Sequence, residues 1–257
     1  MIRRSLAAFL TLATISVVLL LAFRDAGNGG AATPEPAPNA TGTAAEDPTT
    51  SSTLGPDEVT AGEIADRIAA AWSSVTSYRS TTRVFTAGAT PQATPGTDLT
   101  GTAERYVILP DQKRIVIYDG NGTIEIIFSG GVLQQRQTPY GAETGEWVTI
   151  DPTAIEDDDP FAVAYASILA PEQPPYSALG QRQRDRIGTR GDTVTINGRE
   201  CVAYLFPEVT VTGDQIRITI YLGPDDLPCR IETLAGVSVS QTDYVFNQEV
   251  AIATPAS

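Results

Sequence analysis

The chain contains no histidine. Its absence excludes the Ser-His-Asp and Cys-His arrangements of nucleophilic catalysis and removes the most common metal ligand. Glycoside hydrolysis needs only two carboxylates at a cleft, but nothing in the sequence marks a pair of acidic residues for that role. We therefore expect the protein not to be an enzyme and to need neither a metal nor a cofactor.

Three acidic segments have the composition of metal sites. Residues 156–159 (EDDD) precede an apolar segment, where carboxylates cap N–H groups and offset the helix dipole. Residues 119–123 (DGNGT) begin like a calcium-binding loop, but Ile124 stands where that loop needs glycine and Gly130 stands where it needs an acid. Residues 225–228 (DDLP) are typical of a turn between strands. We interpret all three segments as structural.

The N-terminal residues 1–25 predict a segment that enters a membrane. Arg3 and Arg4 precede an uncharged run from Ser5 to Phe23, which as a helix spans about 28 Å, roughly one bilayer core. The run is longer than the ~7–15 residues of a signal-peptide core, whereas the small residues 29–32 (GGAA) offer a cleavage site. An uncleaved anchor and a cleaved signal both stay open. Because paired arginines keep the N-terminus inside, we expect the rest of the chain at the extracytoplasmic face of the cell membrane, or secreted after cleavage.

Composition separates this segment from the folded part. Residues 26–57 have almost no large apolar side chains, so they cannot bury enough surface to offset the cost of ordering and predict a disordered tether.

The net charge is −14 and Lys113 is the only lysine. Phosphates repel a chain of this charge, so nucleic acid is excluded as a partner.

Residues 58–257 predict one domain that begins with a helix. Thr60 and Glu63 have the spacing of a capping box, and Ile64, Ile68 and Trp72 follow at helical spacing. A second helix is expected later in the chain. It runs over residues 161–169, after Asp159 as N-cap and Pro160 at its first position, and it ends before Pro171.

Alternating apolar and polar residues predict strands before and after the second helix. Residues 113–119, 123–129 and 132–138 are separated by Asn-Gly and Gly-Gly, which favour hairpin turns. The last strand is expected over residues 243–255 and ends at Pro255. Since βαβ alternation is absent, we expect the α+β class, with one large curved antiparallel sheet covered by a few helices.

Cys201 and Cys229 are the only cysteines. An even count in an exported chain favours a disulfide, which would stabilise the fold by roughly 3–4 kcal/mol. If residues 200–206, 215–222 and 229–235 form a meander, however, two strand spacings of about 9–10 Å separate the cysteines, beyond the reach of about 7 Å. The sequence leaves the disulfide open.

The predicted strands carry many apolar side chains on one face. Ile124, Ile126 and Phe128 share one parity, and so do Ile218 and Ile220. These residues either fill a closed core under the two helices or line a cavity between the helices and the sheet.

Three parts of the chain together resemble the LolA-like carriers, including the mycobacterial LppX-LprG lipoproteins. They are the helix that leads to WSSVTSY, the sheet segment YVILPDQKRIVIYDGNGTIEIIFSGGVLQQRQTPYGAETGEWVTI, and the ending DLPCRIETL with TDYVFNQEVAIATP. The resemblance covers about residues 60–255. The chain departs from the lipoprotein members because no cysteine stands at the end of its apolar run, so a peptide anchor would replace the acyl anchor.

The resemblance implies an unclosed half-barrel whose open side is plugged by helices and which holds acyl chains in an apolar cavity. Moving a sixteen-carbon chain into water costs on the order of 12 kcal/mol, so a carrier must shield it. Residues 161–169 are expected to act as a lid, because prolines and loops on both sides tie this helix only weakly. The expected lining, chosen by parity, is Trp72, Ile124, Ile126, Phe128, Phe161, Tyr165, Ile168, Ile218, Ile220 and Phe246.

Two functions follow from this interpretation. The first is a membrane-tethered binding protein for a lipid or another apolar molecule, in lipid or lipoprotein transport. The alternative is a protein-interaction or envelope-stress sensor module with the same fold, whose partner is a membrane protein.

Overall fold

The computed structural model describes residues 54–88, 101–118, 122–156, 159, 161–176, 183–211 and 214–252. The expected membrane segment and nearly all of the expected tether lie outside these residues, as does the start of the calcium-like segment at 119–121. Within the described part, no helix has the length and apolar character needed to cross a bilayer.

Twelve strands of the described chain form one antiparallel sheet, which confirms the expected α+β fold. In spatial order they are β1 (Glu58–Thr60), β8 (Ile187–Ile196), β9 (Arg199–Val211), β10 (Asp214–Leu222), β11 (Pro228–Ala235), β12 (Ser238–Phe246), β2 (Ser77–Thr86), β3 (Gly101–Ile108), β4 (Gln112–Tyr118), β5 (Gly122–Ser129), β6 (Val132–Pro139) and β7 (Val148–Ile150). β1 and β7 are the two edges, so the sheet is not closed. The last strand in the chain, β12, pairs with β11 and β2 and thereby joins the two halves of the sheet.

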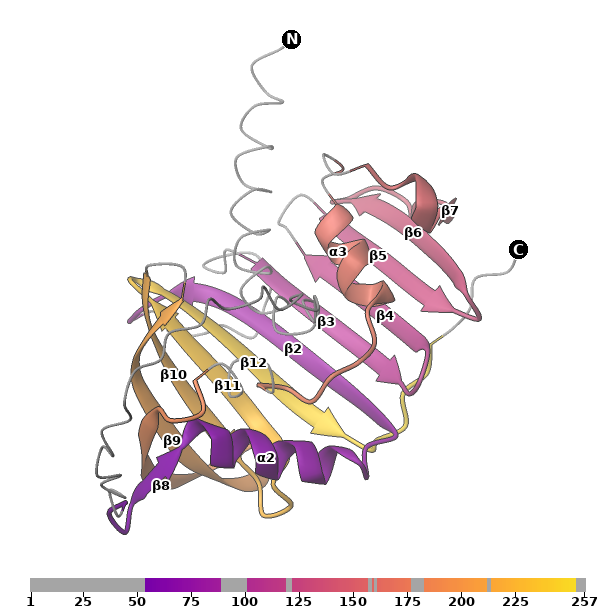
Figure 1. Ribbon diagram of the computed structural model, residues 1–257. Helices are drawn as coiled ribbons and strands as arrows, with labels where there is room; N and C mark the ends of the chain where they lie inside the picture. Colours follow the sequence, from indigo (N-terminus) through magenta and orange to yellow (C-terminus); the bar gives the residue numbers. More distant parts are fainter. Residues whose placement is uncertain are drawn as a thin grey trace, which may run out of the picture.

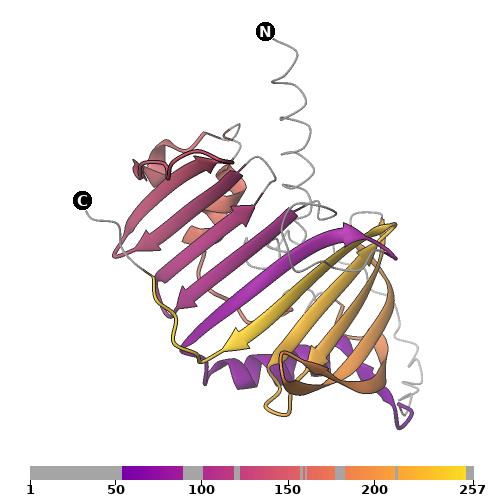
Figure 2. The same ribbon diagram turned by 180° about the vertical axis from the view of Figure 1, so that it is seen from behind.

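Helices α2 (Ala61–Trp72) and α3 (Ala162–Leu169) lie on the same, concave face of the curved sheet (Figure 1). Neither helix lies on the convex face, which Figure 2 shows from behind. A single turn of 3-10 helix, η2 (Pro152–Ala154), precedes α3. The sheet therefore buries one face under two helices that are far apart in the sequence.

The predicted cap is confirmed for α2 but not for α3. The Thr60 Oγ1 accepts a hydrogen bond of 3.1 Å from the N–H of Glu63, as expected for the start of α2. Asp159, the expected N-cap of the second helix, accepts from the N–H of Phe161 at 2.7 Å, but α3 begins at Ala162 and its N-cap is Phe161, whose side chain makes no capping hydrogen bond. In the DDLP segment Asp225 accepts from the N–H of Leu227 at 3.2 Å, so this segment is the expected turn.

The prediction for the last strand was wrong at its C-terminal end, because β12 stops at Phe246 and not at Pro255. Asn247 has a positive φ of 55°, which turns the chain out of the ladder. Its side-chain oxygen accepts from the N–H of Thr76 at 2.9 Å, and its own N–H donates to the Ser77 carbonyl at 2.8 Å. Asn247 thus holds the start of β2 instead of continuing β12.

Cys201 and Cys229 form a disulfide, with their Cα atoms 6.5 Å apart. The register estimate that opposed it assumed an unbroken strand between them. In the structure a bulge at the end of β10 leaves Cys229 of β11 unpaired, between the residues that pair with Tyr221 and Leu222. On the other side of β10, Cys201 of β9 comes just before Val202, which pairs with the last β10 residue, Leu222. The two cysteines therefore meet where β10 no longer separates them.

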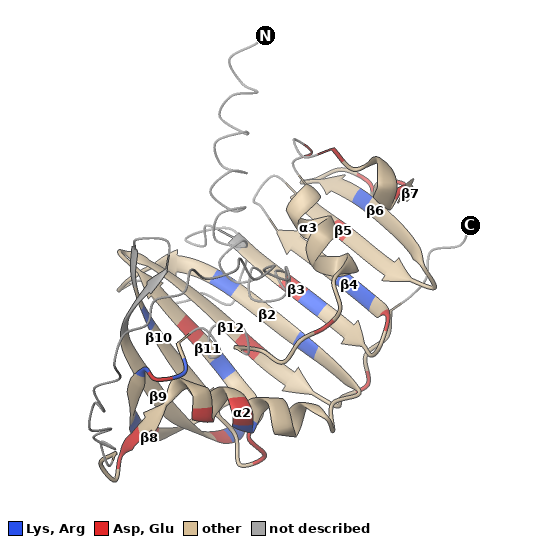
Figure 3. Cartoon of the chain, viewed as in Figure 1, with Lys and Arg blue, Asp and Glu red and all other residues tan. Residues whose placement is uncertain are grey.

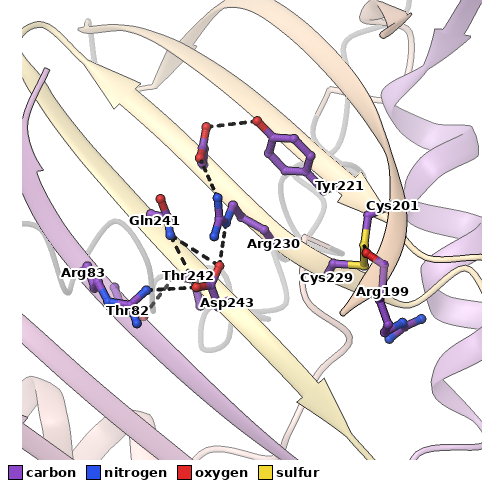
Figure 4. A network of polar contacts seen from close by, with 11 residues as sticks. Thr82, Arg83, Arg199, Cys201, Tyr221, Cys229, Arg230, Gln241, Thr242 and Asp243 are labelled. Atoms are coloured by element: carbon purple, nitrogen blue, oxygen red, sulfur yellow. Dashed lines mark hydrogen bonds and ion pairs between the residues drawn. A yellow bond between two sulfur atoms is a disulfide. The ribbon is translucent and has the colours of Figure 1, made fainter. Parts of the chain in front are cut away.

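The convex face near the disulfide is held by an ion-pair network (Figure 4). Asp243 accepts from Arg83 at 2.9 Å and from Arg230 at 2.6 Å, so one carboxylate links β2, β11 and β12. Gln241 lies next to this carboxylate, 3.4 Å from its oxygens. These contacts pair charged side chains on the convex face.

Candidate functional site

The concave face carries three apolar clusters of buried residues. Helix α2 covers the first, the α2 cluster, which includes Ile64, Ile68, Phe206, Ile216, Ile218, Ile220 and Leu222. Helix α3 covers the second, the α3 cluster, which includes Ile115, Ile117, Ile124, Ile126, Leu133, Tyr165 and Ile168. The third, the aromatic cluster, lies at the C-terminal end of α2 and includes Tyr78, Val107 and Leu227, with Trp72, Tyr244 and Phe246 partly buried against it.

The ten residues predicted as lining are divided among these clusters. Ile218 and Ile220 belong to the α2 cluster, and Trp72 and Phe246 pack in the aromatic cluster with ring centroids 6.1 Å apart. The other six belong to or pack against the α3 cluster: Ile124, Ile126, Phe128, Phe161, Tyr165 and Ile168. All ten therefore lie on the concave side, but in three separate groups.

Helix α3 is unusual for a surface helix because it has no charged residue (Figure 3). Ile168 and Tyr165 are buried against the sheet, with 0% and 2% of their surface exposed. Val163 and Leu169 are only half-buried, as is Phe161 just before the helix. A helix that is apolar on all sides is normally enclosed, so α3 carries more apolar surface than the α3 cluster uses.

A segment that forms neither helix nor strand follows α3, and we call residues 170–176 the strap. In Figure 1 it leaves α3 and runs across the concave face of the sheet. At its end Tyr176 is 4% exposed and packs in the α2 cluster, with its ring 6.0 Å from that of Phe206. The strap thus connects the α3 cluster to the α2 cluster.

The strap is held to the sheet by a buried cluster of charged and polar side chains around Glu172. One carboxylate oxygen of Glu172 accepts from the Tyr78 hydroxyl at 2.5 Å. The other oxygen contacts both Arg105 and the Lys113 ammonium, the latter at 3.1 Å. The side chains of Arg105, Lys113 and Glu172 are only 7%, 2% and 6% exposed. Strands β2, β3 and β4 therefore each place one polar group at the same carboxylate.

The same charged cluster also holds α3. Arg105 donates to the Ser167 hydroxyl at 3.0 Å, and Lys113 donates to the Ala170 carbonyl. Tyr165 on α3 donates to the side-chain oxygen of Gln135 on β6. The expectation that the flanking prolines and loops leave this helix weakly tied was therefore wrong. Buried hydrogen bonds to β3, β4 and β6 hold the helix and its C-terminal end to the sheet.

Burial and the neighbouring charges shift the pKa values of this cluster in opposite directions. Burial alone would raise the pKa of Glu172, but the Arg105 charge, the Tyr78 hydroxyl and the Lys113 charge outweigh it and leave the pKa below its ordinary value. Burial lowers the pKa of Lys113, partly offset by Glu172. Burial raises the pKa of the Tyr78 hydroxyl, so that it stays protonated and donates. On α3, burial raises the pKa of Tyr165 to about 12.

The sequence interpretation missed this charged cluster, although one signal for it was present. Lys113 has the same parity as Ile115 and Ile117, so it points to the apolar face, whereas Arg114 points to the other. Arg105 likewise has the parity of Val107 on β3. Glu172 lies in the irregular segment PEQPP, where no periodicity could indicate its direction.

A hydroxyl-bearing strip lies between the apolar clusters. Ser80 and Thr82 on β2 are 6% and 7% exposed, and Ser80 lies opposite Arg105 in the register of β2 and β3. The Thr82 hydroxyl is 2.9 Å from that of Thr242 on β12. The concave face is therefore polar in its middle and apolar on both sides.

A groove of about 680 Å³ lies beside α2 and differs from the expected apolar cavity. Its lining includes Asp66, Arg67, Arg184 and Asp226, and none of the ten residues predicted to line the cavity belongs to it. The ion pairs Arg67–Asp226 and Arg184–Asp66, at 2.6 and 2.5 Å, cross it. Its charges pair with each other, so we do not assign the ligand to it.

No family model matches the sequence, and a search of curated proteins finds no match either. Solved structures do match. The lipoprotein LppX of Mycobacterium tuberculosis is 12% identical over 75% of this chain and 98% of its own, with a TM-score of 0.40. LprF of Mycobacterium bovis is 13% identical over 77% and 97%, with a TM-score of 0.45. The Pseudomonas aeruginosa MucA/MucB complex contains a chain 15% identical over 74% and 58%, with a TM-score of 0.41.

Proposed function

We propose that the protein is a non-enzymatic binding protein for a lipid or another hydrophobic molecule, which the concave face shields from water in lipid or lipoprotein transport. The observation that carries the proposal is α3, a helix without a charged residue, since Phe161, Val163 and Leu169 are only partly buried beside a buried apolar cluster. Apolar surface at the rim of a buried cluster is typical of a binding site for an apolar partner.

The position in the cell belongs to the same proposal. Residues 1–25 hold the chain at the extracytoplasmic face of the membrane and residues 26–57 give the domain reach, or the domain is released after cleavage. The strap and α3 act together as the cover of the site. Because the Glu172 cluster holds both to the sheet, the cover is closed in this structure, and opening it requires breaking buried ion pairs.

Photo-crosslinking tests the proposal with the full-length chain. Hexadecyl probes that carry a diazirine are incubated with the purified protein, irradiated, and mapped by mass spectrometry of peptides. We expect labels on α3, β4 and β5, at residues that face the α3 cluster. Labels confined to the N-terminal segment, or spread evenly over the convex face, would contradict a binding site on the concave face.

A second candidate function, docking of a partner protein, rests on the part of β8 that extends beyond its short neighbour β1. Its pairing with β1 involves only Ile187, Gly188 and Thr189, and Val194 farther along is 37% exposed. An exposed strand edge can accept a strand from another protein. A photo-reactive amino acid at Val194 tests this in cells, with the exposed Tyr140 as the control position; crosslinked products at both positions or at neither would argue against docking at β8.

A further inference from the structure

We infer that the ligand is an amphiphile with an anionic head group, which exchanges for the Glu172 carboxylate at Arg105 and Lys113 while its hydrocarbon chain lies against α3. This inference rests on the proposed function, because it names the chemical class of the molecule that the concave face binds. The relevant residues lie on two kinds of chain segment, the rigid sheet and the strap.

The two cations share one carboxylate. Arg105 and Lys113 both contact the same oxygen of Glu172, and the second oxygen accepts from Tyr78. With side chains 7% and 2% exposed, both cations have given up most of their hydration. An anion with several oxygens, such as a phosphate, can bond each cation through a separate oxygen, and charge-assisted hydrogen bonds of this kind are strong where water is excluded.

The cations lie on paired strands of the sheet, whereas the anion lies on the strap, which only side-chain contacts hold to the sheet. Arg105 is in the middle of β3 and Lys113 is in β4, and each of these strands pairs with neighbours on both sides. Glu172 lies in the strap, which no strand pairing holds in place. Moving the strap breaks the Glu172 contacts without disturbing the sheet, so the two cations form a preorganised site for another anion.

The surroundings of the cations separate a head-group region from a chain region. Arg105 lies opposite Ile115 in the register of β3 and β4, and Lys113 lies opposite Phe128 in that of β4 and β5. Both partners belong to or pack against the α3 cluster. On the other side Arg105 lies opposite Ser80, at the hydroxyl-bearing strip. A head group at the cations would therefore face hydroxyls on one side and lead its chain onto an apolar surface on the other.

Two diazirine probes with the same chain test this inference on the full-length protein. One is hexadecyl phosphate and the other is hexadecanol. We expect the phosphate to label α3, β4 and β5 at concentrations about tenfold lower than the alcohol, since a hydrogen bond to a charged group is worth roughly that factor. Inorganic phosphate should not compete, and competition by it at equal concentration would show a free-anion site and overturn the amphiphile.

Three variants test whether the preference for the phosphate probe depends on the buried cations. Lys113→Gln should remove most of the preference for the phosphate probe, whereas Arg114→Gln, the neighbouring cation on the convex face, should keep it. Glu172→Gln removes the competing carboxylate and loosens the strap, so it should increase labelling by the phosphate probe several-fold more than labelling by hexadecanol. A merely structural cluster predicts that Lys113→Gln and Glu172→Gln change the labelling by both probes to the same extent.

The possible failures are distinguishable. Equal labelling of the concave face by both probes in the wild-type protein would overturn the anionic head group and leave the proposed function standing. Labelling of the concave face by neither probe would overturn both. A circular dichroism spectrum of each variant verifies that it is folded, and Lys113→Met, which keeps the length of the side chain, replaces Lys113→Gln if that variant is not.

Discussion

Lys113 and Arg114 are neighbours on β4, yet their side chains lie on opposite faces of the sheet and in opposite environments. The Lys113 ammonium is buried on the concave face, 3.1 Å from the Glu172 carboxylate. Arg114 bonds Glu125 at 2.6 Å on the convex face, with 30% of its side chain exposed. One strand thus supplies a cation to each face, and only the concave one meets the strap.

The first prediction concerns the contribution of Glu172 to stability. Glu172→Gln leaves two buried cations without their shared carboxylate, and breaking a buried ion pair from one side typically costs about 3–5 kcal/mol. We expect urea unfolding to show a loss of that order. Asp66→Asn is the control, because the Asp66–Arg184 pair is largely exposed and should matter far less. Equal losses in the two variants would contradict the buried cluster as the main tie of the strap.

The second prediction concerns the pH dependence of that loss. The pKa of Glu172 is lower in the folded state than its ordinary value of about 4.3, so its stabilising contribution is complete above that value. The contribution is lost as the pH falls through the lower folded pKa. The difference in unfolding free energy between wild type and Glu172→Gln should therefore be constant near neutral pH and shrink in acid. A difference that grows as the pH falls would contradict the assignment of the carboxylate.

Much of the fold could be predicted because local patterns decide it. The Thr60 cap, the α2 spacing and the antiparallel pairing of β4 with β5 and of β5 with β6 are set by residues close in sequence, and the structure confirms them. The end of β12 could not be predicted from alternation, because Asn247 leaves the strand to bond Thr76, which is distant in the sequence. The disulfide depended on a bulge at Cys229, which alternation alone does not reveal.

The candidate site was predicted in part. Parity placed all ten expected residues on the concave side, but it could not show that Ile218 and Ile126 belong to different clusters, since that depends on the order of the strands. The buried cluster escaped because its members come from three strands and an irregular segment. Only the parity of Lys113 and Arg105 indicated it, because each is a cation on the same face as buried residues, Ile115 and Val107 respectively.

The third prediction concerns the disulfide. Cys201 and Cys229 are separated by 28 residues, and closing a loop of that length stabilises a fold by about 3–4 kcal/mol through the entropy of the unfolded chain. The double substitution Cys201→Ser with Cys229→Ser should lower the free energy of unfolding by about that amount. Thiol alkylation of the unfolded wild-type chain before and after reduction verifies the bond. Free thiols before reduction would contradict it.

The last prediction compares two glycines on β8. A Cβ added at Gly188 would lie 2.5 Å from the Phe206 ring and 2.8 Å from the Leu205 carbonyl oxygen, so Gly188→Ala must displace a side chain that is 0% exposed. Overpacking of this kind typically costs about 1–3 kcal/mol. At Gly191 the nearest atom is the Ala203 Cβ at 3.5 Å, an ordinary contact, so Gly191→Ala should be neutral or slightly stabilising because it restricts the unfolded chain. Urea unfolding of both variants measures the difference, and a tolerated Gly188→Ala would mean that Phe206 and the adjoining Tyr176 are free to move, so that the end of the strap is not anchored in the α2 cluster.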